Sequence, residues 1–110
     1  MYKKNDAAYD ACVRLLSAPD ESFKAYSQYK DIWLFQASQY LVYHLVFYRD
    51  YTTKKDEFQD FKHKSQEEVD LIKKVLGVLR KINPDSDELW QRKTNNIELL
   101  EYVLSQIPSR

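Results

Sequence analysis

The fold is decided by one stretch, residues 32–48, which reads IWLFQASQYLVYHLVFY. Its β-branched and aromatic residues are typical of strands, but seventeen residues without a turn signal are too many for one strand. We therefore expect a helix here, as part of a longer helix over residues 20–51. The stretch contains polar residues such as Gln36 and His44 and falls short of the ~20 apolar residues of a membrane span. A helix that is apolar on nearly all sides lies either at the centre of its domain or under a partner.

Three further segments space their apolar residues as helices do, at about residues 6–17, 54–82 and 86–107. Four helices with short connections predict an all-α fold, a four-helix up-and-down bundle with a long, mostly apolar second helix. We expect residues 1–110 to form one domain, because this length suits a single core. Ser65 and Glu68 have capping-box spacing, so the third helix is expected to break or kink near residues 63–66. Gly77 is expected at a close helix crossing.

The composition argues against several classes of protein. The 17 basic and 17 acidic residues give no net charge, whereas binders of nucleic acids or membrane surfaces usually carry a basic excess. A single glycine argues against Gly-rich nucleotide loops, and we expect no cofactor. The single cysteine, Cys12, excludes an internal disulfide and is expected to be a small core residue. With no recognisable signal peptide or membrane span, we expect a cytoplasmic protein.

The residues that could carry catalysis or bind a metal do not form a complete site. Asp60 and His63 have the spacing of a ligand pair in helical di-metal proteins, but those proteins need two such motifs. Lys62 and Lys64 flank His63 and predict a solvated, charged surface. His44 has no serine, cysteine or acid one helical turn away, so we expect a histidine of the core or its rim. We therefore expect no catalytic residues and no metal site.

Aromatic residues are concentrated in the first half of the chain and are densest around residues 40–51. Tyrosine and arginine are enriched at protein interfaces, and a tyrosine ring is apolar at one end and polar at the other. We therefore predict a non-enzymatic protein-interaction module, of inhibitor, immunity, chaperone or assembly type, that binds a partner protein through an aromatic-rich helical surface. The predicted partner-binding residues are Tyr40, Tyr43, His44, Phe47, Tyr48, Arg49, Asp50 and Tyr51.

Two alternatives stay open. The chain can instead be a small-molecule- or metal-binding helical bundle, with or without enzymatic activity, whose pocket near His44 is lined by Trp33, Tyr40 and Tyr43. A homo-oligomer is compatible with either function. A homodimer would cover the outer face of the second helix at Val42 and Val46. Neither a nucleic acid nor a membrane is expected as a partner.

Overall fold

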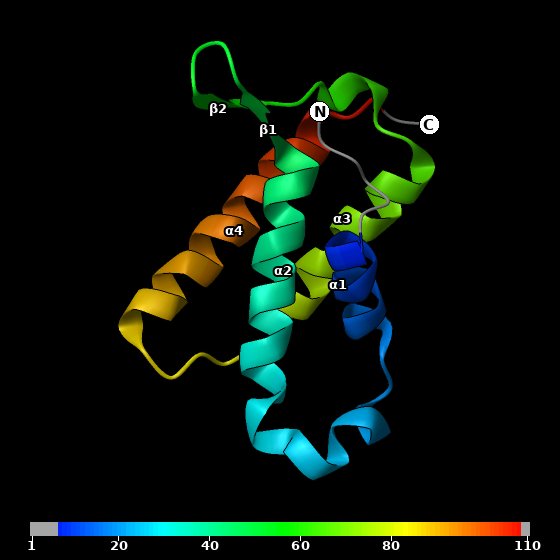
Figure 1. The fold of residues 1–110 in the computed structure, drawn as a ribbon, viewed down its shortest axis with the longest axis vertical. Helices are drawn as coiled ribbons and strands as arrows, with labels where there is room; N and C mark the ends of the chain where they lie inside the picture. The colour runs from blue at the N-terminus through cyan, green and yellow to red at the C-terminus, as the bar shows by residue number, and fades with distance from the viewer. Residues whose placement is uncertain (1–6, 109–110) are drawn as a thin grey trace.

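The computed structural model describes residues 7–108, which form a mostly helical fold (Figure 1). The α-helices in this part of the chain are α1 (Ala7–Ser17), α2 (Lys30–Val46), α3 (Gln66–Lys81) and α4 (Asp87–Gln106). Two 3-10 helices, η1 (Asp20–Tyr29) and η2 (Phe61–His63), accompany them, and strands β1 (Phe47–Asp50) and β2 (Lys55–Phe58) form a hairpin. The predicted helical class is confirmed, whereas a four-helix up-and-down bundle is not. The expected start of the first helix, at residue 6, lies outside the described residues.

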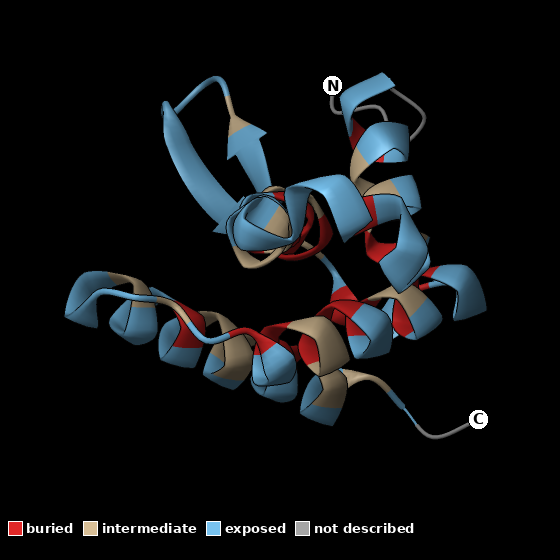
Figure 2. Cartoon of the chain, turned by 90° about the horizontal axis from the view of Figure 1, so that it is seen from below, coloured by how far each residue is buried: buried red, intermediate tan, exposed pale blue. Residues whose placement is uncertain are grey.

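Helix α2 is the centre of the fold. It packs against α1, α3 and α4, and its Leu41, Leu45 and Val46 are fully buried. In Figure 2 the buried segments face inward, whereas the hairpin beside α2 is largely exposed. Because helices of the same chain bury both Val42 and Val46, the expected dimer surface at these residues is wrong. No helix within residues 7–108 is both long enough and apolar enough to cross a membrane.

The expected long helix over residues 20–51 is wrong at both ends. Its first third forms η1, which is kinked at Tyr26 with φ −132° and ψ 31°. At the other end, α2 stops after 17 residues, because Phe47 takes up extended backbone angles, φ −116° and ψ 159°. The β-branched and aromatic residues that suggested a strand therefore divide between two structures. Those up to Val46 are helical, and those from Phe47 onward begin β1.

The hairpin closes through the polar residues that follow β1. Asp50 Oδ1 accepts hydrogen bonds from the backbone N–H groups of Thr52 and Thr53, at 2.9 and 3.4 Å. Lys54 then adopts a positive φ of 57°, which turns the chain back into β2. An aspartate that binds backbone groups two and three residues ahead is a common turn device. These bonds turn the chain directly after residue 51, where the second helix was expected to end.

The hairpin is held by side-chain pairs across its antiparallel register. Phe47 lies opposite Phe58, and their rings stack with centroids 5.2 Å apart. Arg49 lies opposite Asp56, with Nη1 3.6 Å from Oδ1. A two-stranded hairpin alone is marginally stable in water, so it depends on packing of this kind. Phe58 extends that packing to Phe61 of η2, with ring centroids 5.8 Å apart.

The expected third helix over residues 54–82 is wrong in its first part, where Lys55–Phe58 form β2 and Phe61–His63 form η2. The expected break near residues 63–66 is present, and α3 begins at Gln66. Ser65 Oγ accepts from the Glu68 N–H at 3.1 Å, and Glu68 Oε1 accepts from the Ser65 N–H at 3.4 Å. This is the capping box that the sequence predicted.

The expected role of Gly77 is wrong, because a Cβ placed there meets nothing within 4 Å. No close helix crossing requires a glycine at this position.

Candidate functional site

The predicted binding residues lie together, but they do not lie on one helix. Tyr40, Tyr43 and His44 belong to the last turns of α2. The next four, residues 47–50, form β1, and Tyr51 begins the turn of the hairpin. Figure 1 shows this hairpin projecting from the end of α2, with its base beside the C-terminal end of α4, where the Phe58 and Tyr102 ring centroids are 6.3 Å apart. The predicted helical surface is therefore corrected to a surface built from a helix end and a hairpin.

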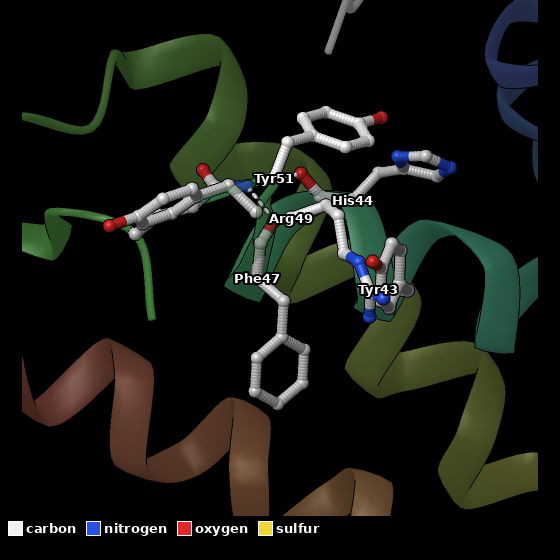
Figure 3. Close-up of a pocket in the computed structure, with 7 residues that line it drawn as sticks. Tyr43, His44, Phe47, Arg49 and Tyr51 are labelled. Atoms are coloured by element: carbon white, nitrogen blue, oxygen red, sulfur yellow. Dashed lines mark hydrogen bonds between the residues drawn. The ribbon is translucent and has the colours of Figure 1, made fainter. Parts of the chain in front are cut away.

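A hollow of ≈ 480 Å³ lies at this junction (Figure 3). We call it the junction hollow. Its lining residues are Tyr43, His44, Phe47, Tyr48, Arg49, Tyr51 and Gln59. All of these except Gln59 were predicted from the sequence, whereas the predicted Tyr40 and Asp50 do not line it. The side chains in Figure 3 project in different directions, with the Phe47 ring pointing away from the His44 ring.

The tyrosine rings of the junction hollow are its most exposed aromatic parts. Tyr51 is 76% exposed, Tyr48 44% and Tyr43 36%. Phe47 instead is half-buried and packs against the core. The His44 ring lies against Tyr40, with centroids 4.2 Å apart, and meets Tyr43 edge-on at 5.2 Å. The tyrosines therefore face solvent, while Phe47 anchors the hairpin.

Asp56 connects the hairpin to α2. Its Oδ1 accepts a hydrogen bond of 2.8 Å from the Tyr43 hydroxyl and lies 3.6 Å from Arg49 Nη1. The hydrogen bond to Asp56 is the main cause that raises the pKa of Tyr43 above its ordinary value. Tyr43 therefore stays a neutral hydrogen-bond donor at physiological pH, and its ring is held beside the Arg49 side chain (Figure 3).

A polar network fixes the base of the hairpin. Gln59 Nε2 donates to the backbone carbonyls of His44 and Phe47, at 2.7 and 2.6 Å. Gln59 Oε1 accepts from Lys64 Nζ at 2.6 Å, and Lys64 Nζ also donates to Glu68 Oε2 at 3.0 Å. The network therefore joins the last turn of α2 to the first turn of α3.

Lys64 was expected on a solvated surface, and this expectation is wrong. It is only 3% exposed, and Glu68 is 9% exposed. A buried ammonium group needs an opposite charge and hydrogen-bond acceptors, and Glu68 and Gln59 supply them. Gln59 was missed in the sequence because its partners, His44 on α2 and Phe47 on β1, lie 15 and 12 residues away. In the sequence, Gln59 stands in a polar run, which is typical of surface residues.

The pocket proposed as an alternative is present only in part. Tyr43 and His44 line the junction hollow, but Trp33 and Tyr40 do not. Trp33 lies near the opposite end of α2, where it packs against Tyr26 and Tyr29 with centroids 5.7 and 5.8 Å away. The rings around Trp33 and the rings around His44 therefore form two separate clusters.

Asp60 and His63 form a surface pair. His63 Nδ1 lies within hydrogen-bond distance of Asp60 Oδ2, and both side chains are more than half exposed. The His63 hydrogen bond is the largest cause that lowers the pKa of Asp60, and the Lys62 backbone N–H adds to it. Within residues 7–108, no group of three His, Cys, Asp or Glu side chains lies close enough to hold a metal ion.

Searches against protein-family models, curated proteins and solved structures find no match to this chain. The geometry of the junction hollow and of the hairpin is therefore the basis for proposing a function.

Proposed function

We propose that this chain is a non-enzymatic interaction module that binds a partner protein through the hairpin and the end of α2. We call this the junction surface, and its central residues are Tyr43, Tyr48, Arg49 and Tyr51. The proposed partner is another protein, and the type of module is an inhibitor, immunity, chaperone or assembly protein. A homo-oligomer is compatible with this proposal, because both outer edges of the hairpin are unpaired among the described strands.

One observation carries the proposal. Solvent-exposed tyrosine rings and an arginine gather on a hairpin that projects from the helical core and is anchored at its base. Exposed rings of this kind contribute little to folding, whereas Tyr and Arg are enriched at binding hot spots. The anchoring by Phe47 and Gln59 holds the rings in place before binding, which lowers the entropy cost of association.

We also propose a cytoplasmic location for this binding. The single cysteine, Cys12, is half-buried against the core, and a chain with one cysteine suits a reducing compartment.

A small-molecule site is the second candidate. It is favoured by the junction hollow itself, whose ≈ 480 Å³ lies within the ~300–1,000 Å³ that ligand pockets usually occupy. A thermal-shift screen of small aromatic compounds checks it. A compound that raises the unfolding midpoint of the wild type, and not that of a His44→Gln variant, would favour this candidate over protein binding.

The main proposal is tested by affinity capture from the native host, followed by mass spectrometry. Wild type is compared with the double variant Tyr48→Ala/Tyr51→Ala. The matched control is Tyr26→Ala/Tyr29→Ala, which removes two tyrosines that are 55% and 44% exposed on the distant aromatic cluster. We expect the hairpin variant to lose one specific protein that both the wild type and the control retain. If the control loses it instead, or both variants retain it, the junction surface is not the binding site.

A further inference from the structure

We infer that the junction hollow receives an acidic side chain from the partner protein, with Arg49 as the group that binds its carboxylate. This inference rests on the proposed function and specifies the chemistry of the partner segment.

The charge of the hollow supports this inference. Its lining holds one cation, Arg49, and no carboxylate. The whole chain is neutral, with 17 basic and 17 acidic residues, so the hollow is locally more basic than the protein as a whole. An acidic group entering it would meet attraction from the Arg49 guanidinium.

Two acids next to lining residues are already engaged. Asp50 accepts from the backbone of the turn, at Thr52 and Thr53. Asp56 accepts a hydrogen bond of 2.8 Å from Tyr43. The remaining contact, 3.6 Å between Arg49 Nη1 and Asp56 Oδ1, is longer than an N–H···O hydrogen bond.

Arg49 is therefore available to an incoming anion. Its guanidinium carries five N–H donors in a planar fork, which matches a carboxylate in a bidentate arrangement. Within the described part of the chain, Arg49 makes one ion pair, the loose contact with Asp56. The Arg49 side chain is 44% exposed. A carboxylate in the hollow can replace the weak Asp56 contact with two direct hydrogen bonds.

The exposure of the walls favours a side chain of a larger partner over a free small molecule. Small-molecule sites usually bury about 70–90% of their ligand. The three tyrosines that form the walls are themselves 36–76% exposed, so they cannot enclose a ligand to that extent. A partner protein can cover the tyrosines from outside, which removes water from around the Arg49–carboxylate pair and strengthens it.

The test uses two short synthetic peptides in which tryptophan alternates with either glutamate or glutamine, separated by glycine. Each is titrated into isotope-labelled protein, and binding is followed by the NMR signals of the hairpin amides and of the Arg49 side chain. We expect the glutamate peptide to bind about tenfold more tightly than the glutamine peptide, which is the effect of a charge-assisted hydrogen bond.

Three variants assign that preference to Arg49. Arg49→Gln should abolish the difference between the peptides. Asp56→Asn should enlarge it, because the competing carboxylate is removed. Arg80→Gln, a matched control on α3 whose arginine is 53% exposed and paired with Glu101, should leave it unchanged.

Equal binding of the two peptides, no binding of either, or a preference that persists in Arg49→Gln would overturn the inference. The proposed function is judged separately, because capture of a partner that depends on Tyr48 and Tyr51 would still support it. Loss of that capture result would remove the proposed function whatever the peptides do.

Discussion

The buried Lys64–Glu68 pair gives the sharpest prediction about stability. Lys64 Nζ lies 3.0 Å from Glu68 Oε2 and 2.6 Å from Gln59 Oε1, and its side chain is 3% exposed. Replacing Lys64 by Met keeps much of the side-chain volume but removes the charge and the donors. Glu68 would then lose its buried cationic partner, and Gln59 would lose a hydrogen-bond donor.

The expected cost follows from burial. Removing one partner of a buried ion pair destabilises a protein by about 3–5 kcal/mol, because the remaining charge is left without compensation. A domain of this size has a total unfolding free energy of roughly 5–15 kcal/mol, so Lys64→Met should remove a large part of it. The double variant Lys64→Met/Glu68→Leu removes both charges, and it should cost less than the single variant. Part of its cost is the lost capping box, since Glu68 also accepts from Ser65.

The assay is urea unfolding, monitored by circular dichroism. It compares wild type, the single variants Lys64→Met and Glu68→Leu, and the double variant in a double-mutant cycle. The matched control is Arg80→Met, which breaks an exposed pair with Glu101 of 2.8 Å and should cost less than about 1 kcal/mol. The control pair is the shorter of the two, so the comparison separates burial from distance. Two results would refute this reasoning: Lys64→Met lowers the unfolding free energy no more than Arg80→Met does, or the double variant is as unstable as Lys64→Met. Either result would show that an unpaired Glu68 charge does not destabilise the fold.

Three further predictions follow from single positions. Gly77→Ala should raise the unfolding free energy by about 0.5–1 kcal/mol in denaturant titrations, because alanine favours the helix and its Cβ meets nothing within 4 Å; a destabilised variant would contradict this. Ser38→Ala should stabilise the fold by about 1 kcal/mol, because Ser38 Oγ is buried without a hydrogen-bond partner among the described residues; an unfolding midpoint lower than that of wild type would show that the hydroxyl is satisfied. Burial, followed by the Glu68 charge, raises the pKa of Tyr9 from 10.0 to about 12. Its folded pKa therefore exceeds its unfolded pKa, so its stabilising effect is complete below pH 10 and is lost as pH rises toward 12. Tyr9→Phe should show a smaller loss of stability over that range in denaturant titrations, and an unchanged loss would assign it to another group.

Some of the site was predictable because its residues are neighbours in sequence. Tyr43, His44, Phe47 and Tyr48 stand close together in the chain, so any local structure brings them near one another. The partners that shape the site come from further along. Asp56 lies 13 residues from Tyr43, and Gln59 lies 15 residues from His44. Helical spacing relates residues three or four positions apart, so it contains no information about these contacts.

The sequence by itself determined the helices whose signals are local. The Ser65–Glu68 capping box marked a break at the point where α3 begins, although the helix expected before it, from residue 54, is not there. The spacing of apolar residues marked α1 and α4 within a few residues of their observed bounds. These features depend on interactions between residues at most four positions apart, and the sequence displays them directly.

The tertiary structure alone decided where α2 ends and what surrounds Lys64. Phe47 leaves the helix because Phe58 lies across from it in the hairpin, a pairing of residues 11 positions apart. Lys64 stands between charged and polar neighbours in the sequence, yet the packing around it leaves it 3% exposed. Burial and strand pairing depend on which distant segments meet, and that is a property of the packed chain.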